Sequence, residues 1–421
     1  DTHATTIADG ASDPGRALFL KYTGTLDSAC TITLGPNTVS KMWFIQNSTS
    51  GSQSIIIKQG SGATITILTG DTKAVYSNGA GSGAAIVDAF TNISFPSLST
   101  STAGTSNLRL GVNAGDAIAS GGNYNVVVGD EAGTAITTGD QNVAIGFEAL
   151  ATEDTRGGST ALGYRALKAQ NGDTANTHNV GIGADAGLSL STGNRNVYVG
   201  ALSGDANTTG DGNTAVGHNT LSTNTHSENN VAVGYEALKT FNVGSGSGFN
   251  TAVGAVAGTA LTTGVNNTLI GGLAGDALTD ADNNTAMGKS ALSADTLGSN
   301  STAIGRKALG TQNFTTATDA YNTAVGAFAG EAVTTGINNT LIGATAGDAI
   351  TTGQQNTAVG RASLGATTTS NNNTAMGYYA LTSNTTAADN TAFGASALGA
   401  NTTGASNTAV GKGAGLSVTT G

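Results

Sequence analysis

The sequence predicts an all-β protein in which an N-terminal β-sandwich or jelly roll precedes an 18-turn parallel β-roll. Two observations carry this prediction. One five-residue phrase, of the form Asn-Thr-Ala-Val-Gly, recurs 18 times after residue 107, and the first hundred residues hold seven short alternating runs separated by turn residues. We therefore divide the chain into a sandwich at 1–96, a linker at 97–106 and a repetitive shaft at 107–421.

The spacing of the phrase predicts a solenoid. Thirteen of the 17 intervals between its closing glycines are 17 residues long, and the others are 18, 20, 20 and 21. A repeat this short corresponds to one turn stacked on the last. The closing glycines are Gly111, Gly129, Gly146, Gly163, Gly183, Gly200, Gly217, Gly234, Gly254, Gly271, Gly288, Gly305, Gly326, Gly343, Gly360, Gly377, Gly394 and Gly411.

Residues within the phrase alternate with a period of two, which is typical of a short strand with one buried face. The residue before each glycine is apolar in all 18 copies, and the residue two positions earlier is Thr or Val except at Leu108. Alanine usually stands between them. We expect the larger residues, including Val216 and Val233, to line the core. The rest of each turn predicts a second short strand or extended segment, as at 347–353.

The ends of the phrase predict turns and a side-chain ladder. Asn opens 16 copies, and Ser159 and Ser301 open the other two. Stacked Asn side chains can hydrogen-bond from turn to turn, and the closing glycine can adopt a positive φ. Residues that we assign to this structural repeat include Asn142, Gly146, Asn213, Val216, Gly217, Asn230, Val233, Gly234, Asn356 and Gly360.

A longer period is superimposed on the single turn. Four residues after the glycine stands Gly or Leu, in a Gly-Gly-Leu-Leu order that repeats four times. The three longest intervals begin 71 residues apart, so we expect loops at 164–178, 235–249 and 306–321, about 19 Å apart along the stack. Their aromatic residues are candidate receptor contacts, and the alternative is that the rings only pack against the roll. These residues are Tyr164, Tyr235, Phe241, Phe249, Phe314 and Tyr321.

The small size of each turn favours self-association. Each turn can bury little more than one Val or Ile, one Thr or Val and a few Ala. Burial of each large side chain stabilises the fold by roughly 1.5–3 kcal/mol. Ordering the backbone of 17 residues costs about 17 kcal/mol or more in conformational entropy. The recurrent alanine suggests a second face that another backbone approaches. We expect a homotrimer.

The first hundred residues predict a compact antiparallel sandwich or jelly roll. Cys30 alternates with Ile32 and Leu34, so we expect it to be a small buried hydrophobe. A single cysteine forms no internal disulfide, which fits a reducing compartment. The seven runs are 17–22, 30–34, 42–46, 54–58, 63–68, 72–76 and 84–88.

Composition narrows the function classes. The net charge of −11 with only 10% charged residues argues against a nucleic-acid partner, and we expect the charges to be scattered over a solvated face. The sequence contains no run of 18 consecutive apolar residues, so we expect no membrane-spanning segment. The composition would also suit a disordered chain, but disorder does not preserve an 18-fold apolar register.

The sequence offers little chemistry. None of the four histidines stands at ligand spacing from a recurring carboxylate or cysteine, so we predict no metal site. The Gly-x-Gly fragments follow no dinucleotide-binding pattern. We predict no catalytic residue and no cofactor. Asp116, Asp276 and Asp348 are expected to be turn residues with free side chains. The alternative is a glycosidase, in which a trimer would bring two carboxylates from different chains together.

The phrase Asn-Thr-Ala-Val-Gly, followed by small residues, resembles the head repeats of trimeric autotransporter adhesins, which form parallel β-rolls. Runs such as residues 373–384 (Asn-Thr-Ala-Met-Gly-Tyr-Tyr-Ala-Leu-Thr-Ser-Asn) look more like repeats in bacteriophage tail fibres, and residues 18–90 are similar to β-domains of phage virion proteins. The period is longer than that of the usual adhesin head. The repeat resemblance covers about residues 107–421.

The resemblance implies a homotrimeric fibre in a phage virion that attaches to the host surface. Its partners would be itself, other virion proteins through the N-terminal domain, and a host cell-surface glycan or protein. The alternatives are the head of a bacterial trimeric adhesin at the cell surface and a polysaccharide-degrading tailspike. A purely structural virion fibre without receptor contact is also open.

Overall fold

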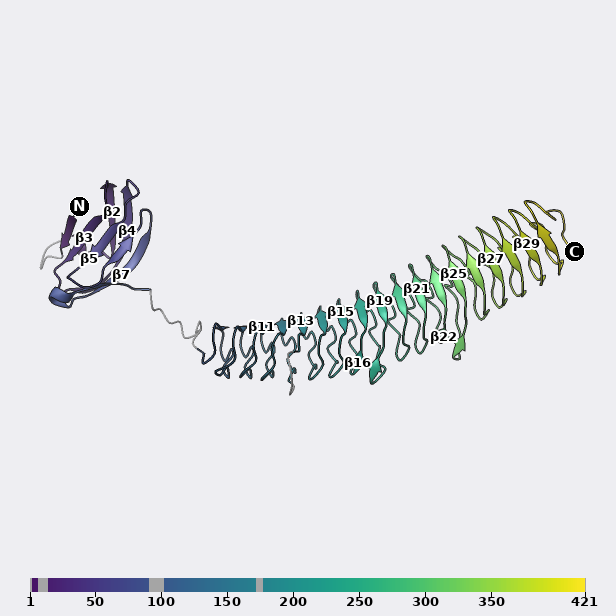
Figure 1. Ribbon diagram of the computed structural model, residues 1–421, viewed down its shortest axis with the longest axis horizontal. Helices are drawn as coiled ribbons and strands as arrows, with labels where there is room; N and C mark the ends of the chain where they lie inside the picture. Colours follow the sequence, from purple (N-terminus) through teal and green to yellow (C-terminus); the bar gives the residue numbers. More distant parts are fainter. Residues whose placement is uncertain (1, 7–13, 91–101, 172–176, 421) are drawn as a thin grey trace. The chain divides into compact units, whose positions relative to one another are not determined.

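The computed structural model describes residues 2–6, 14–90, 102–171 and 177–420. The chain divides into two units, residues 1–96 and 97–421, which we describe separately (Figure 1). Within the described residues, strands dominate, and the only helices are the short 3-10 turns η1 (Pro14–Arg16) and η2 (Gly81–Gly83). The predicted all-β class is confirmed.

The N-terminal unit consists of two four-stranded sheets. Its apolar core contains Trp43, Ile45 and Ile57, all almost completely buried, and the buried Cys30 belongs to the same cluster, as expected. The Trp43 indole nitrogen donates a hydrogen bond of 2.9 Å to the Gly15 carbonyl. One sheet has the order β1 (Thr2–Thr6), β3 (Cys30–Gly35), β5 (Ile55–Lys58) and β6 (Ile65–Ile67), and the other β2 (Phe19–Thr25), β4 (Ser40–Ser50), β7 (Thr72–Asn78) and β8 (Ile86–Asp88).

The expectation of a purely antiparallel sandwich is wrong. All seven predicted runs overlap strands, but β1 pairs with β3, β3 with β5 and β2 with β4 in parallel. The other three pairings are antiparallel. The first five strands alternate between the two sheets, so strands two apart in sequence become neighbours and run in the same direction. Run spacing alone does not reveal such crossing.

The second unit is a parallel β-roll of 18 turns, as predicted. Each three-residue strand pairs in register with the strands of the turns before and after, so that Val216 lies beside Val199 and Val233. Its strands are β9 (Leu108–Leu110), β10 (Val126–Val128), β11 (Val143–Ile145), β12 (Thr160–Leu162), β13 (Val180–Ile182), β14 (Val197–Val199), β15 (Thr214–Val216), β17 (Val231–Val233), β19 (Thr251–Val253), β20 (Thr268–Ile270), β21 (Thr285–Met287), β23 (Thr302–Ile304), β25 (Thr323–Val325), β26 (Thr340–Ile342), β27 (Thr357–Val359), β28 (Thr374–Met376), β29 (Thr391–Phe393) and β30 (Thr408–Val410).

Closing glycines stack into a column that admits no side chain. In 17 turns their φ angles lie between +128° and +144°, and in the last turn Gly411 has +123°, a conformation that L-residues avoid. A β-carbon built on Gly234 would lie 2.5 Å from the carbonyl oxygen of Gly254. Glycine is therefore required by both backbone conformation and close stacking.

The asparagine ladder is confirmed. The backbone amide of Asn213 donates to the side-chain oxygen of Asn196 at 2.9 Å, and its side-chain amide donates to the Ser227 carbonyl at 2.9 Å. The side-chain oxygen of Asn213 in turn accepts from the backbone amide of Asn230 at 3.1 Å. Each buried Asn thus links three successive turns and satisfies backbone groups that the narrow interior hides from water.

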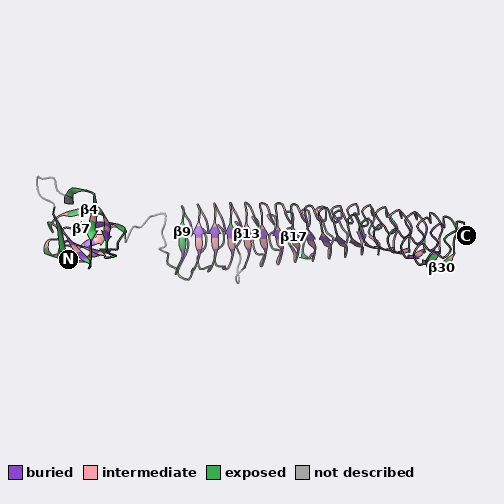
Figure 2. Ribbon diagram, turned by 90° about the horizontal axis from the view of Figure 1, so that it is seen from above, coloured by how far each residue is buried: buried purple, intermediate pink, exposed green. Residues whose placement is uncertain are grey.

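The predicted inward face is wrong. The alanine in the middle of each strand points inward, and Ala144, Ala215 and Ala232 are completely buried. Val216 and Val233 lie on the outer face and are only half-buried. Figure 2 shows the buried stripe along the strands. Alternation reveals that two faces differ, but not which one is inside. Because the roll is narrow, the small residue takes the interior and the larger ones face outward.

The interior is filled from the opposite wall. Turns with Leu four residues after the glycine bury that leucine, as at Leu150 and Leu238, in a left-handed conformation near φ +50°. Most turns with Gly at that position bury an aliphatic residue three places later instead, as at Ile136 and Leu278. The Gly/Leu quartet seen in the sequence therefore corresponds to two ways of filling the interior of a turn.

No second strand forms in the segment where we expected one. Residues 347–353 are assigned as turns and bends, although their backbone still bonds to the next turn, from Gly347 to Ser363 at 2.9 Å and from Thr351 to Thr368 at 2.8 Å. Two of the long intervals add small parallel pairs, β16 (Ser227–Glu228) with β18 (Gly246–Ser247) and β22 (Gly298–Ser299) with β24 (Thr318–Asp319).

Candidate functional site

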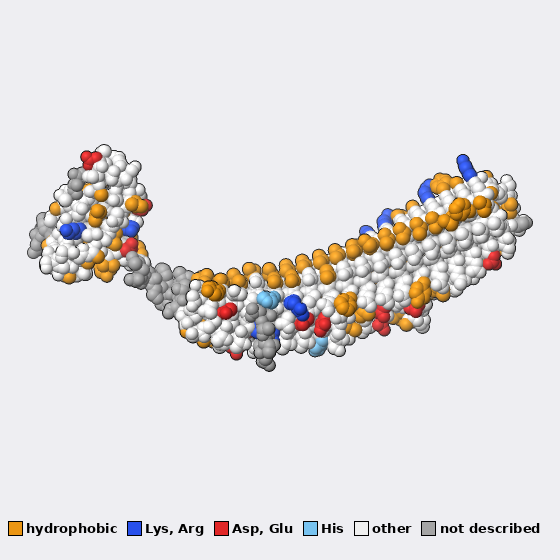
Figure 3. Space-filling model, viewed as in Figure 1, with side chains coloured by type: hydrophobic (Ala, Val, Ile, Leu, Met, Phe, Trp, Pro, Cys, Tyr) orange, Lys and Arg blue, Asp and Glu red, His pale blue; other side chains and the backbone are white. Residues whose placement is uncertain are grey.

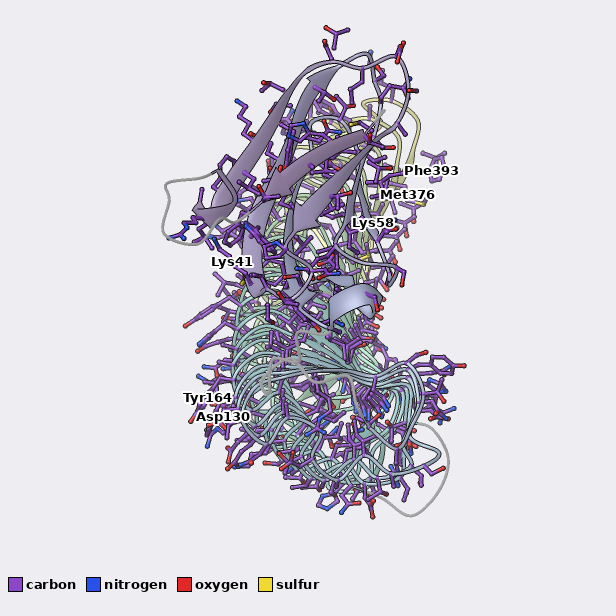
Figure 4. The ribbon with its side chains drawn as sticks, turned by 90° about the vertical axis from the view of Figure 1, so that its left-hand side faces the viewer. Lys41, Lys58, Asp130, Tyr164, Met376 and Phe393 are labelled. Atoms are coloured by element: carbon purple, nitrogen blue, oxygen red, sulfur yellow. The ribbon has the colours of Figure 1, made fainter. Side chains whose placement is uncertain are left out.

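The most extensive candidate surface is an apolar column on the outer face of the roll. It consists of the residue before each closing glycine and is apolar in all 18 turns. Figure 3 shows a continuous line of hydrophobic side chains along the roll, and Figure 4 shows Met376 and Phe393 pointing away from it. The apolar column is Leu110, Val128, Ile145, Leu162, Ile182, Val199, Val216, Val233, Val253, Ile270, Met287, Ile304, Val325, Ile342, Val359, Met376, Phe393 and Val410.

A second column of Val and Thr runs beside it, two residues earlier in each strand. It is Val-rich in the first turns, as at Val126 and Val143, and mostly Thr from Thr214 onward. Both columns are exposed or half-buried in the single chain. Three-residue strands stacked over 18 turns give a face of about 10 Å by 85 Å, or roughly 850 Å². A long, partly exposed face that carries an unbroken apolar column is a candidate interaction surface.

The six aromatic candidates do not form one surface. Tyr164, Tyr235, Phe249 and Tyr321 are about half exposed, as expected of contact residues. Part of the loop at 164–178 lies outside the described residues.

Phe241 and Phe314 are buried, at 0% and 6% exposure, so their assignment as surface contacts is wrong. Phe241 occupies the inward slot that an aliphatic residue fills in other turns. The amide of Phe314 donates to the buried Asp295 carboxylate at 3.0 Å.

Two of the exposed tyrosines belong to stacked ring pairs that the sequence reasoning missed. Phe147 stacks on Tyr164 with ring centroids 5.5 Å apart, and His218 stacks on Tyr235 at 5.9 Å. All four residues directly follow a closing glycine, which puts them on one edge of consecutive turns. Figure 4 shows Tyr164 and Asp130, another residue at this position, pointing outward together.

Two buried polar networks explain why serine replaces asparagine twice. Gln170 donates to the Glu153 carboxylate at 2.7 Å and to the Ser159 hydroxyl at 3.0 Å. It also accepts from Asn179 at 3.0 Å, and so takes the place of the missing ladder side chain. Gln312 repeats the arrangement with Asp295, Ser301 and Asn322.

The carboxylates in these networks are structural groups. Glu153 and Asp295 have no exposed surface. Burial raises the pKa of Glu153 above its ordinary value, although hydrogen bonds from Gln170 and the Arg156 amide oppose the rise. Because neither carboxylate reaches the surface, no polymeric substrate can contact it within one chain.

The recurring aspartates are not equivalent. Asp116, expected to be free, forms a 2.5 Å ion pair with Arg109. Asp276 has a buried side-chain oxygen without a hydrogen-bond partner. Burial raises the pKa of Asp276 and of Asp348 above their ordinary value. These residues lie in separate turns and share no ligand geometry.

The N-terminal unit has an exposed apolar patch on the outer face of its second sheet. Phe19 pairs with Phe44 across β2 and β4, and Met42 pairs with Tyr76 across β4 and β7. All four side chains are at least one-third exposed. The patch is a candidate contact surface for this unit.

Chemical sites are sparse in the part of the chain that the structure describes. Among these residues, no three His, Cys, Asp or Glu side chains gather closely enough to hold a metal ion. None of the described segments forms an apolar helix of the length that a bilayer crossing requires.

Comparison with known proteins gives no assignment. No protein-family model matches this chain, and no curated protein or solved structure shows significant similarity to it.

Proposed function

We propose that this chain is a structural fibre of a phage virion, assembled as a homotrimer, that projects from the particle and mediates attachment to the host surface. The unbroken apolar column on the outside of the roll carries the proposal. A single chain leaves 18 apolar side chains partly in contact with water, and a partner of the same length and periodicity would cover them.

A second copy of the chain matches both of those requirements. Three faces of about 850 Å² each, packed around a common axis, would bury roughly 2,500 Å², which falls in the range of obligate assemblies. The apolar part of this area, buried at about 25 cal/mol per Å², would favour the trimer.

The geometry of the roll supports a spacer role. Eighteen turns at about 4.8 Å each make a rod of roughly 80–90 Å. Turn-to-turn hydrogen bonds through the Asn ladder hold neighbouring turns together, which suits a stiff spacer that presents side chains to a partner. Three identical surfaces on one fibre would also supply avidity.

Assignment to a virion rests on the resemblance of the repeats to phage tail fibres and of residues 18–90 to phage β-domains. In this proposal the N-terminal unit contacts other virion proteins, and its patch around Phe19 and Phe44 is the candidate surface. The bacterial adhesin head remains the alternative that shares the same roll. A polysaccharide-degrading tailspike is the second alternative, in which Glu153 and Asp295 would take no part because they are buried.

Two measurements test the proposal. Sedimentation of the purified chain should give the mass of three 41.0 kDa chains, and a monomer at micromolar concentration would contradict the assembly. Antibodies against residues 107–421 should decorate an appendage of intact phage particles in negative-stain images. Decoration of a bacterial surface in the absence of phage would favour the adhesin head instead.

A further inference from the structure

The charges of the C-terminal third of the roll are segregated, contrary to the scattered arrangement that the sequence suggested. We call the residue directly after each closing glycine the edge column. Four of the five Lys and Arg residues between 288 and 421 lie in it, and the fifth, Lys307, is the next residue along. Figure 3 shows these blue side chains in a line along the upper edge of the roll. The edge-column cations are Lys289, Arg306, Arg361 and Lys412.

These four cations are exposed and not neutralised. Among the described residues, no carboxylate lies within ion-pair distance of them, whereas the adjacent Lys307 pairs with Glu331 at 2.9 Å. The five acidic residues in this part of the chain, Asp295, Asp319, Glu331, Asp348 and Asp389, all lie at other positions of the turn. The edge is thus a positive line on a chain of net charge −11.

Aromatic rings hold the two arginines in place. The guanidinium of Arg306 lies 4.9 Å from the centre of the Phe328 ring. That of Arg361 lies 5.8 Å and 5.7 Å from the rings of Tyr378 and Tyr379. Such contacts restrict the side chain. Arg361 also donates one N–H to the Tyr378 hydroxyl at 3.4 Å, and its other N–H groups can face an anion.

The spacing of the cations follows whole turns of the roll. Lys289 and Arg306 occupy consecutive turns, and Arg306, Arg361 and Lys412 follow each other at intervals of three turns, or about 14 Å. In the other turns between Arg306 and Lys412 the edge column holds Ala327, Ala344 and Ala395, and Tyr378, whose ring lies against Arg361. The four charges span seven turn intervals, about 34 Å.

We infer that this edge of the roll binds a linear anionic polysaccharide through its acidic groups. A small anion would meet one cation at a time, whereas a polymer engages several at once and gains from their effective concentration. The inference rests on the proposed attachment function, for which it names the class of ligand.

Spacing also argues against a nucleic acid. One DNA strand carries a charge about every 3.4 Å, so it would carry about four phosphates for each three-turn interval between cations and expose most of them to an acidic protein. The ring faces of Tyr378 and Tyr379 are engaged by Arg361 and by each other, at 4.3 Å, and are less available for base stacking. A polysaccharide with widely separated acidic groups suits the array better.

The test uses the full chain, three dextrans that differ in their charged groups, and one nucleic acid. Binding to carboxymethyl-dextran, dextran sulfate, plain dextran and poly(dT) is measured by biolayer interferometry at two salt concentrations. We expect binding to at least one of the two charged dextrans, weakened by salt, and none to plain dextran. The preferred charged dextran distinguishes carboxylate from sulfate recognition. Equal binding to plain dextran, stronger binding to poly(dT), or no binding to either charged dextran would overturn the inference.

A matched pair of triple variants locates the site. Arg306→Gln, Arg361→Gln and Lys412→Gln together should weaken binding at least about tenfold, because the lost contacts act multiplicatively. The control replaces Lys21, Lys73 and Arg195 by Gln, which removes the same charge away from the edge column, and should change binding less than about twofold. Equal losses in both variants would refute the edge as the site.

Circular dichroism and sedimentation of both variants control for folding and assembly. If the wild type binds the charged dextrans but antibodies against residues 107–421 fail to decorate phage particles, the proposed function fails and the ligand class stands. If phage decoration succeeds and both variants bind like the wild type, the edge-column inference alone fails.

Discussion

Two neighbouring residues, Ala215 and Val216, give the sharpest test of which strand face is inside. Ala215 is completely buried in the interior of the roll, and Val216 is half-buried on the outer face. Substituting each by Asp introduces the same charge one residue apart. Under the inward assignment that alternation alone suggests, the order of severity would be reversed.

The expected costs differ severalfold. At position 215 the carboxylate would lie among apolar side chains without a partner, and an unpaired buried charge costs about 3–5 kcal/mol. That is a large part of the 5–15 kcal/mol that typically stabilises a domain. At position 216 the carboxylate can reach water in the single chain, and the loss of part of one valine's burial costs about 1 kcal/mol.

The effect on assembly is the opposite. In a trimer joined at the apolar column, Val216→Asp would bring three carboxylates into an apolar interface. We therefore expect this variant to retain its β-sheet circular dichroism while sedimenting as a 41.0 kDa chain. Val216→Thr is the control, since Thr is already common in the adjacent outer column, and should stay trimeric.

Far-UV circular dichroism with thermal unfolding, followed by sedimentation equilibrium, reads out both effects. Ala215→Asp should lose its cooperative unfolding or aggregate. A stable, folded Ala215→Asp chain beside an unfolded Val216→Asp chain would refute the inward placement of the alanines.

Three further predictions concern the interior. Gly234→Ala should lower the free energy of unfolding by about 3 kcal/mol or more, because of the 2.5 Å clash with Gly254 and the disfavoured φ. Gly244→Ala, with open space around it, should lower it by only about 1 kcal/mol in urea unfolding. Equal losses would contradict the glycine stacking. Asn213→Ala should lose about 2–4 kcal/mol, because buried partners in two turns become unpaired, and Asn407→Ala in the last turn far less; similar losses would argue against the ladder. The raised pKa of Glu153 means that its protonation stabilises the fold below the ordinary pKa of 4.5 and that this stability is lost as pH rises through the folded-state pKa. Glu153→Gln should flatten that part of the pH dependence of melting, and an unchanged profile would contradict it.

Much of the roll was predictable because its repeat is local and strict. The turn length, the parallel register, the Asn ladder and the glycine column each follow from a position that recurs in nearly every copy. Stacking identical turns places identical residues beside one another, so the periodicity of the sequence directly becomes the register of the strands.

The inward face was not predictable from alternation. Period two separates the faces of a strand, but the rule that large apolar residues lie inside fails when the interior is as narrow as one turn of this roll. The buried leucines, such as Leu238, offered a signal, since they already fill the space opposite Ala232. Taken together, the two positions leave no room inside for Val233.

The buried aromatic side chains, the polar networks and the strand pairing of the N-terminal unit could not be predicted for other reasons. Phe241 and Phe314 were assigned to the surface because they lie in long intervals, yet Phe241 occupies the slot filled by aliphatic residues in regular turns. The link between Ser159 and Gln170 joins residues 11 apart on facing walls, and only the folded turn brings them together. In the N-terminal unit, the crossing of strands between sheets leaves no mark on the individual runs.

The distance between copies at the apolar column tests the central claim most directly. In a Cys30→Ser background, nitroxide labels on Val216→Cys would be compared with labels on His226→Cys, an exposed residue on another wall, by pulsed electron paramagnetic resonance. A trimer joined at the column should give short distances between subunits for position 216 and clearly longer ones for position 226. The opposite order, or no distance between subunits at either position, would contradict it.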